Sequence, residues 1–336
     1  MLAAHADWST NPAKRWLCCA RQRGSRWHVA APTLLGETQT LFMRLLAEAG
    51  GGPVALGVDL PLGLPRAFVA KHIRALPDFP AFLAGLKDKP EFFAVAERLE
   101  EISPARPFYP ARSRAGVSRD AHAKALGLSG RAALNRACDR ATAERPAGAP
   151  PFWTLGANQS GKAAIHAWQF LLVPALAEGM PIRLWPFAGP FRSLLAPQSI
   201  AVAETYPAEC MRHLGLPTRG SKRRQADRAL LAGDLLAALE RLSAIPERGL
   251  VVDIENGFGR DAVGEDRLDS LIGLLGVLNV LAGHRPDTAP ADPWIQAWEG
   301  WVLGQTALPK TWPEGTGEIL PEPQGLRRAQ HAAACG

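Results

Sequence analysis

The chain has 336 residues, of which 47% are hydrophobic and 21% charged, and its formal net charge is +6. This composition is typical of a folded globular protein and excludes a wholly disordered chain or a fibrous repeat. No apolar run reaches the roughly 18–20 residues that a membrane span needs, and the N-terminus lacks the basic-then-apolar order of a signal peptide. We therefore expect a cytoplasmic protein without a membrane partner, whose basic charge suits a polyanion such as nucleic acid.

The first sixty residues predict the core of a sheet. Three apolar segments, residues 2–8, 14–22 and 26–32, predict strands that form an antiparallel meander, with Gly24-Ser25 as a tight turn. Residues 38–49 have helical apolar spacing. The continuous apolar run over residues 53–60 then predicts a buried strand that lies parallel to the first.

Residues 61–198 predict a large helical insertion between the fourth and fifth strands. The strand pattern disappears, and proline-rich loops separate segments with helical spacing. The predicted helices span residues 65–76, 90–102, 118–126, 130–142 and 161–178. The middle of the insertion is rich in arginine, so we expect it to be basic.

The remaining segments return to the predicted sheet. Residues 199–205 predict a fifth buried strand, and helices are expected at residues 208–213, 221–232, 233–244 and 266–281. We expect residues 1–305 to form one α/β domain with a mixed sheet, made of the three-strand meander and two parallel strands, and helices on both faces. Residues 306–336 read as an extended tail that contains proline and tryptophan.

Acidic residues stand where the predicted strands end. Asp7 ends the first strand, Asp59 the fourth and Glu204 the fifth, while Asp266 and Asp269 lie three apart at the start of the last helix. The carboxyl ends of parallel strands share one edge, where open α/β sheets bind ligands. We therefore expect these five candidate catalytic acids to converge. Singly, each is also compatible with a turn or with a helix N-terminus.

Clustered carboxylates predict a divalent-metal site. Such groups repel one another strongly unless cations neutralise them, and oxygen ligands favour Mg²⁺ or Mn²⁺ over zinc. The predicted metal ligands are Asp7, Asp59, Glu204 and Asp269. A pair of ions about 4 Å apart is the apparatus of in-line phosphodiester hydrolysis, so we expect a two-metal nuclease with DNA or RNA as its partner.

Two basic groups are candidate phosphate contacts. Lys222, Arg223 and Arg224 open a predicted helix and are typical of residues that hold a phosphate backbone, although a solvated turn is the alternative. Lys162 and His166 lie four apart near another helix start, where a solvated helix face is again the alternative.

Residues 156–162 have the G-x-x-x-x-G-K spacing of a P-loop. A working P-loop needs Ser or Thr at the next position to hold Mg²⁺, and this chain has Ala163 there. The preceding segment is also a poor buried strand. We therefore do not expect a nucleotide-hydrolysing P-loop.

Four motifs carry a family resemblance: GVDLPLGLP (57–65), AETYPAE (203–209), GEDRLDS (264–270) and EGWVLG (299–304). Together with the predicted order of strands and helices, they resemble the uncharacterised predicted-nuclease family known as domain of unknown function 429, which has a ribonuclease H-like fold. The resemblance covers residues 2–305 and implies a metal-dependent nuclease.

The resemblance also implies roles for individual acids. Asp7 is similar to the first-strand acid of the superfamily, Asp59 to the fourth-strand acid and Asp269 to the last-helix acid, with Asp266 beside it as in Holliday-junction resolvases. Ribonucleases H carry a further Glu on the first helix, and Glu204 either substitutes for it or has another role.

Two other functions fit the same features. The first is a non-catalytic nucleic-acid or protein-binding domain in which the acids are structural. The second is an actin-like ATP-dependent phosphotransferase, whose fold contains two copies of such a core. The sequence predicts a single copy.

Overall fold

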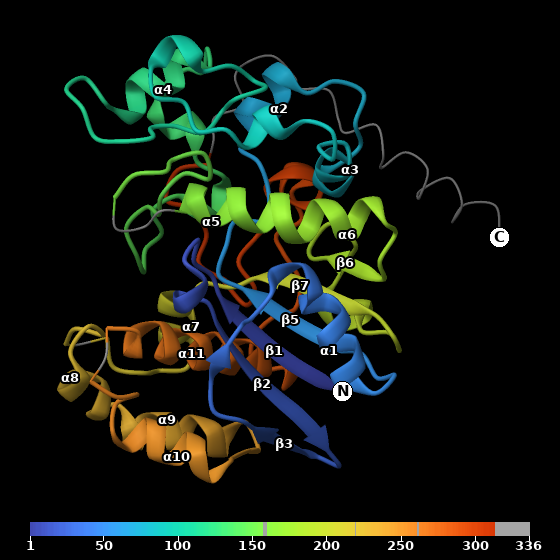
Figure 1. The fold of residues 1–336 in the computed structure, drawn as a ribbon, viewed down its shortest axis with the longest axis vertical. Coiled ribbons are helices and arrows are strands. Elements are labelled where there is room, and N and C mark those ends of the chain that lie inside the picture. Colours follow the sequence, from blue (N-terminus) through green and yellow to red (C-terminus); the bar gives the residue numbers. More distant parts are fainter. Residues whose placement is uncertain (157–159, 219, 261, 313–336) are drawn as a thin grey trace, which may run out of the picture. The chain divides into compact units, whose positions relative to one another are not determined.

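The computed structural model describes residues 1–156, 160–218, 220–260 and 262–312 (Figure 1). It contains two compact units, each formed by separate stretches of the chain. The first unit comprises Met1–Leu60, Pro181–Thr288 and Val302–Thr306. Among the described residues, the second comprises Pro61–Met180, Ala289–Trp301 and residues 307–312.

The first unit is an α/β structure around one mixed sheet. The strand order is β6-β7-β5-β1-β2-β3-β8, with β4 paired to β2. The strands are β1 (Leu2–Asp7), β2 (Trp16–Arg23), β3 (Arg26–Val29), β4 (Thr33–Leu34), β5 (Val54–Val58), β6 (Ile182–Leu184), β7 (Ile200–Glu204) and β8 (Ala244–Pro246). β1, β2 and β3 pair antiparallel, whereas β5 lies parallel to both β1 and β7. The predicted meander and parallel strands are therefore present.

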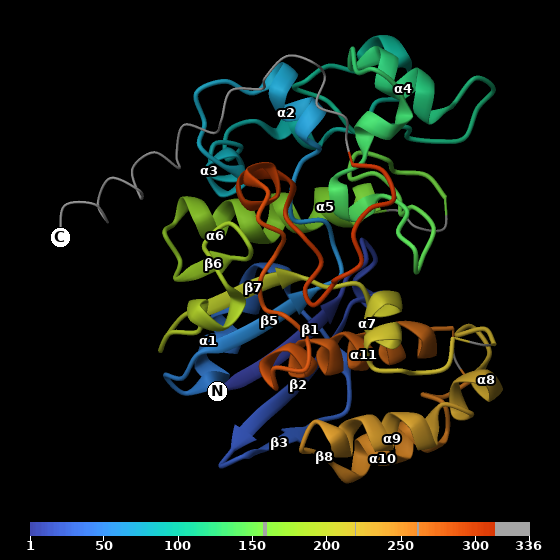
Figure 2. The ribbon, with the colours of Figure 1, turned by 180° about the vertical axis from the view of Figure 1, so that it is seen from behind.

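Helices cover both faces of this sheet. α1 (Leu41–Ala49) lies on one face and α11 (Gly264–Leu281) on the other (Figures 1 and 2). The other helices of the unit are α7 (Pro207–His213), α8 (Gln225–Ala229), α9 (Ala232–Arg241) and α10 (Arg248–Glu255), with 3₁₀ turns η1 (Pro12–Lys14), η2 (Thr38–Thr40) and η8 (Phe191–Leu194). All of β1 is buried between the two layers.

Glycines allow α11 to approach the sheet closely. A Cβ added at Gly273 would lie 2.2 Å from ring atoms of His5 on β1, and one added at Gly57 of β5 would lie 2.7 Å from Cγ2 of Val277. Neither position has room for a side chain. The close contact brings the first turns of α11 toward the ends of β1 and β5.

The second unit consists of helices and turns around an aromatic core. Its helices are α2 (Arg66–His72), α3 (Phe79–Ala84), α4 (Arg119–Ala125), α5 (Ser160–Ala167), the π-helical η7 (Trp168–Leu172) and α6 (Val173–Ala177). The turns are η3 (Pro90–Phe93), η4 (Leu99–Glu101), η5 (Arg131–Leu134), η6 (Ala137–Asp139) and the π-helical η9 (Ile295–Glu299). Phe68, Phe92, Phe108 and Phe152 pack edge to face.

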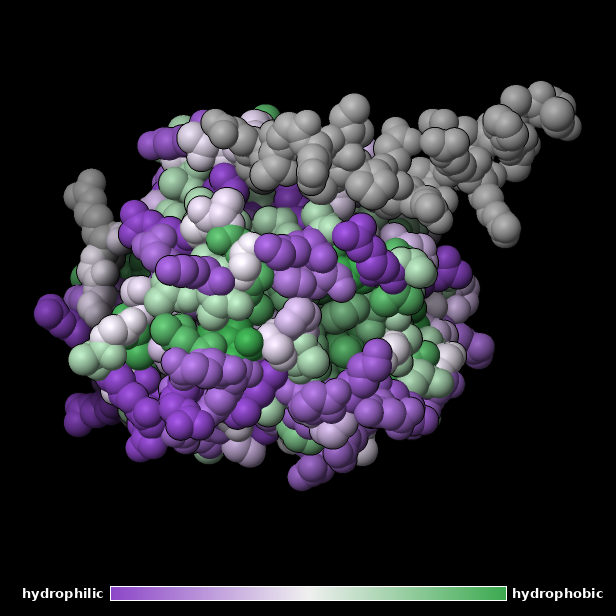
Figure 3. Space-filling model, turned by 90° about the horizontal axis from the view of Figure 1, so that it is seen from above, coloured by the Kyte–Doolittle hydropathy of each residue, from purple (hydrophilic) through white to green (hydrophobic). Residues whose placement is uncertain are grey.

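Figure 3 shows hydrophilic side chains interspersed with hydrophobic areas on one face of the molecule.

Some predicted elements are wrong. β6 lies within the predicted helical insertion, residues 61–198, and neither β8 nor α10 was predicted. The strands β6 and β8 have only three residues each, too few to show an alternating pattern. Residues 90–102 and 130–142 form 3₁₀ turns rather than α-helices. In the first of these segments Phe92 and Phe93 pack into the aromatic core, so their spacing does not reflect a helical face.

No helix in the described ranges is long and apolar enough to cross a membrane. The described cysteines, Cys18, Cys19, Cys138 and Cys210, are free thiols. Within the P-loop-like segment, residues 157–159 lie outside the described residues, as do residues 313–336 of the predicted tail.

Candidate metal centre

The sheet register places Asp7 beside Asp59. Ala6 of β1 pairs with Val58 of β5, and the amide of Asp59 donates to the carbonyl of Ala6 at 3.1 Å. The two carboxylates therefore follow the same rung of the parallel ladder, in the row that also contains His5. Because His5 contacts α11, this row faces that helix.

Helix α11 contributes the other two acids on this face. Asp266 and Asp269 lie in its first turns, one turn apart. Both interact electrostatically with Asp7, and Asp269 also interacts with Asp59. We call these four residues, Asp7, Asp59, Asp266 and Asp269, the carboxylate cluster. It lies entirely within the first unit.

Burial raises the pKa of every member of the cluster, and repulsion between its acids adds to this for Asp7, Asp59 and Asp266. Burial is the largest cause for Asp7, followed by repulsion from Asp269, Asp59 and Asp266. Burial, followed by repulsion from Asp269, raises the pKa of Asp59 to about 7, and burial raises that of Asp266 to about 6 despite the opposing effect of Lys14. The cluster therefore resists full ionisation unless a cation enters it.

Three of the four carboxylates lack partners. Asp7 is only 8% exposed, yet within the described ranges no side-chain hydrogen bond or ion pair reaches it, or reaches Asp59. Oδ2 of Asp266 is buried and likewise has no hydrogen-bond partner among those residues. Unpaired carboxylates withdrawn from water are costly. This donor set of oxygens fits a hard cation such as Mg²⁺ or Mn²⁺.

The fourth carboxylate, Asp269, has a lysine partner. Nζ of Lys222 lies 2.6 and 2.7 Å from its two oxygens. Burial lowers the pKa of Lys222, but the negative charge and hydrogen bonds of Asp269 outweigh it, so the pKa is raised overall. For Asp269 burial outweighs Lys222, and its pKa is raised. The predicted phosphate contact Lys222 is thus bound to a carboxylate of the cluster.

The other predicted phosphate contacts are exposed arginines of the first unit or belong to the second unit. Arg223 and Arg224 have side chains 79% and 78% exposed and reach Glu265 and Asp227 only at 3.7 and 4.0 Å. Lys162 and His166 belong to the second unit, on α5. There, the His166 ring packs on Phe170.

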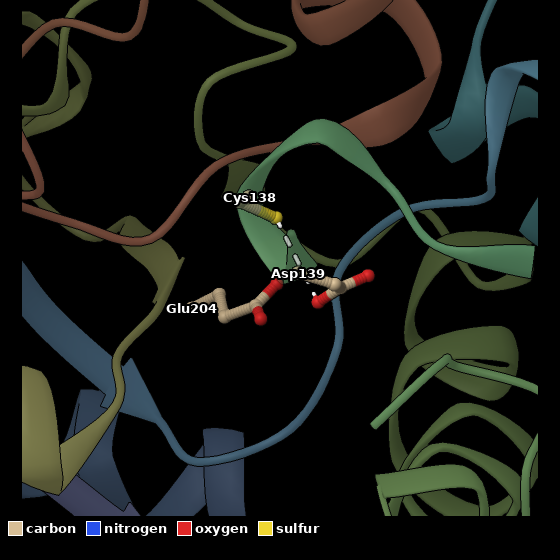
Figure 4. Close-up of side chains that lie close together, drawn as sticks. All are labelled: Cys138, Asp139 and Glu204. Carbon is tan, nitrogen blue, oxygen red and sulfur yellow. Dashed lines mark hydrogen bonds between the residues drawn. The ribbon is translucent and has the colours of Figure 1, made fainter. Parts of the chain in front are cut away.

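Glu204 belongs to the other row of the sheet. It pairs in register with Val58 rather than Asp59, so the alternation along the strands directs its side chain to the opposite face. Burial and the charges of Asp269 and Lys222 each affect the pKa of Asp59 more than repulsion from Glu204 does. Figure 4 shows Glu204 at the end of β7, and Cys138 and Asp139 together on η6 of the second unit. We therefore leave Glu204 out of the candidate ligand set.

Sequence reasoning missed Thr205 and Lys14. Thr205 directly follows β7 and lies in the row of Asp59, and its buried Oγ1 has no hydrogen-bond partner among the described residues. Lys14, at the end of η1, lowers the pKa of Asp266. The signal for Thr205 was its place directly after Glu204, since a shift of one residue along a strand exchanges the faces.

Many arginines of the insertion are engaged within the second unit. Arg112 and Arg114 pair with Glu97, Arg98 and Arg106 pair with Glu101, and Arg136 pairs with Asp139. Arg119 stacks on Trp153. These arginines are therefore held by contacts inside the unit, but two of them share each of Glu97 and Glu101, so a net positive charge remains.

Comparison with known proteins identifies no relative: no family model, curated protein or solved structure matches this chain.

Proposed function

We propose that this protein is a divalent-metal-dependent nuclease that hydrolyses phosphodiester bonds at the carboxylate cluster. The observation that carries the proposal is the unpaired state of Asp7, which is buried, and of Asp59 and Asp266, which are half-buried; none of the three has an ion-pair or hydrogen-bond partner for its carboxylate in the described part of the chain. A folded protein tolerates such charges where a cation is to be bound. The resemblance to ribonuclease H-like nucleases supports the same function.

Different residues of the chain would bind the metal and the nucleic-acid backbone. Asp7 and Asp59 are fixed by the ladder between β1 and β5, and Asp266 by α11, so these three would hold Mg²⁺ or Mn²⁺. When bound, such an ion activates water and neutralises charge on a phosphate. Arg223 and Arg224 directly follow Lys222 in the sequence. Both are exposed and would contact the nucleic-acid backbone.

The test measures metal binding and cleavage in the same protein. Mn²⁺ is titrated calorimetrically into metal-free protein and into the double variant Asp7→Asn/Asp269→Asn. Single- and double-stranded DNA and RNA are then incubated with both proteins and Mg²⁺. We expect Mn²⁺ binding and cleavage of one substrate class by the parent, and loss of both in the variant.

Other outcomes would reject the proposal. Cleavage that persists in the double variant would place the chemistry elsewhere. Nucleic-acid binding that needs no metal and leads to no cleavage would instead identify a binding domain with structural acids. Absence of Mn²⁺ binding in the presence of substrate would remove the basis of the proposal.

A further inference from the structure

Lys222 is held in the carboxylate cluster by a built framework. Its carbonyl accepts from Nη1 of Arg228 at 2.6 Å, and Arg228 is 1% exposed. Nε and Nη2 of Arg228 donate to the carbonyls of Gly257 and Gly259, both at 2.8 Å. Burying an arginine on three carbonyls is a specific arrangement, which distinguishes Lys222 from a surface lysine that meets an acid by chance.

The framework also contacts the helix that carries the acids. A Cβ added at Gly264, the first residue of α11, would lie 2.3 Å from Nη2 of Arg228. The turn around Lys222 is further fixed by the amide of Ser221, which donates to Oδ2 of Asp227 at 2.8 Å. The backbone of Lys222 and the start of α11 are therefore positioned by the same arginine.

The contact with Asp269 uses both of its oxygens. Nζ of Lys222 lies 2.6 and 2.7 Å from them, and the two side chains are 27% and 15% exposed. A metal ion that also used Asp269 would have to compete with this ammonium group. Lys14 and Lys222 attract the other carboxylates only from a distance, and no lysine or arginine among the described residues forms an ion pair with Asp7, Asp59 or Asp266.

On the basis of the proposed function, we propose that the ammonium group of Lys222 takes the place of one of two cations. The folded protein then binds a single divalent ion on Asp7, Asp59 and Asp266, and a second ion is admitted only when Lys222 leaves Asp269. The lysine stem is long and flexible while its backbone is anchored, so its ammonium group can move without the turn. A released ammonium group is then free to contact a phosphate.

The test counts metal ions in the parent, in Lys222→Met and in Lys222→Arg. Mn²⁺ binding is measured by calorimetry, and the electron paramagnetic resonance spectrum distinguishes isolated ions from a coupled pair. We expect one isolated ion in the parent and in Lys222→Arg. In Lys222→Met we expect a second ion and a coupled spectrum, or Mn²⁺ binding tighter by about tenfold or more, because a positive charge has been removed.

A matched control is Arg248→Gln, which removes an exposed positive charge at the start of α10. It should bind Mn²⁺ like the parent. Two ions in the parent, or identical binding in the parent and Lys222→Met, would overturn the role of Lys222 while leaving the proposed function intact. No Mn²⁺ binding in either protein would overturn both. If Lys222→Met does not fold, the count in the parent still tests the proposal, since two ions there would overturn it.

Discussion

Two buried carboxylates, Glu299 in the second unit and Asp7 in the first, have opposite surroundings. In the second unit Glu299 has a fully buried side chain, yet Arg66 contacts it with Nη2 at 2.7 Å and with its backbone amide at 3.1 Å. Arg66 also pairs with Asp292 at 3.0 Å. In the first unit Asp7 is buried without an arginine or any other side-chain partner among the described residues. Compensated charges of the first kind stabilise a fold, whereas uncompensated ones are suited to receiving a cation.

The largest expected effect is on catalysis. Replacement of Asp7 by Asn removes a carboxylate that would hold the metal, so metal-dependent cleavage should fall about a thousandfold or more. Single-turnover cleavage at saturating Mg²⁺ measures it. The control is Asp234→Asn, an exposed acid in the first turn of α9, which should cleave like the parent. Parent-like activity of Asp7→Asn would mean that Asp7, like Glu299, does not take part in catalysis.

The next largest effect is a loss of stability in the second unit. Arg66→Met leaves the buried Glu299 without its cation, so the free energy of unfolding should fall by about 3–5 kcal/mol. Urea denaturation measures the change. Adding Glu299→Gln to this variant should recover part of the loss, since the uncompensated charge is gone. A loss below about 1 kcal/mol in Arg66→Met would show that the ion pair is not what compensates Glu299.

In contrast to Arg66→Met, replacement of Asp59 is expected to raise the free energy of unfolding of the metal-free protein. The pKa of Asp59 is raised to about 7 by burial and by repulsion from Asp269, so the unfolded chain releases this proton at lower pH than the folded protein. This carboxyl group therefore destabilises the metal-free protein progressively as pH rises from about 4 to about 7. Asp59→Asn should be more stable than the parent at pH 8, by on the order of 2 kcal/mol.

The advantage of Asp59→Asn should disappear at about pH 3, below the pKa of the carboxyl in both states, where it is protonated in the folded and in the unfolded protein. Thermal unfolding in a chelator at both pH values checks this. Mn²⁺ should reverse the order at pH 8 by stabilising only the parent. A variant less stable than the parent at pH 8 in chelator would mean that Asp59 is compensated after all.

The smallest effect concerns the exposed arginines. Arg223→Gln/Arg224→Gln should weaken nucleic-acid binding modestly and lower the salt dependence of log K by about 2, one for each lost phosphate contact. Cleavage at saturating substrate should change little. Filter binding across a salt series measures it, and an unchanged slope would assign both side chains to solvent.

Strand ends were the informative part of the sequence, because parallel strands bring their carboxyl ends to one edge whatever the surrounding loops do. Asp7 and Asp59 were located in this way, and helical spacing placed Asp266 and Asp269 on one face. The short edge strands β6 and β8 were missed, since three residues carry no measurable periodicity.

By itself, the sequence determined the mixed α/β sheet and the edge where its acids gather, because strand and helix periods are local properties. Only the tertiary structure decided which acids share a face. Glu204 and Thr205 are neighbours in the sequence but point to opposite faces of the sheet. Which of them lies on the face of Asp59 depends on the register between β7 and β5, which the sequence does not reveal. The tertiary structure also brought Lys222 onto Asp269, since 47 positions separate the two and a buried arginine sets the turn between them.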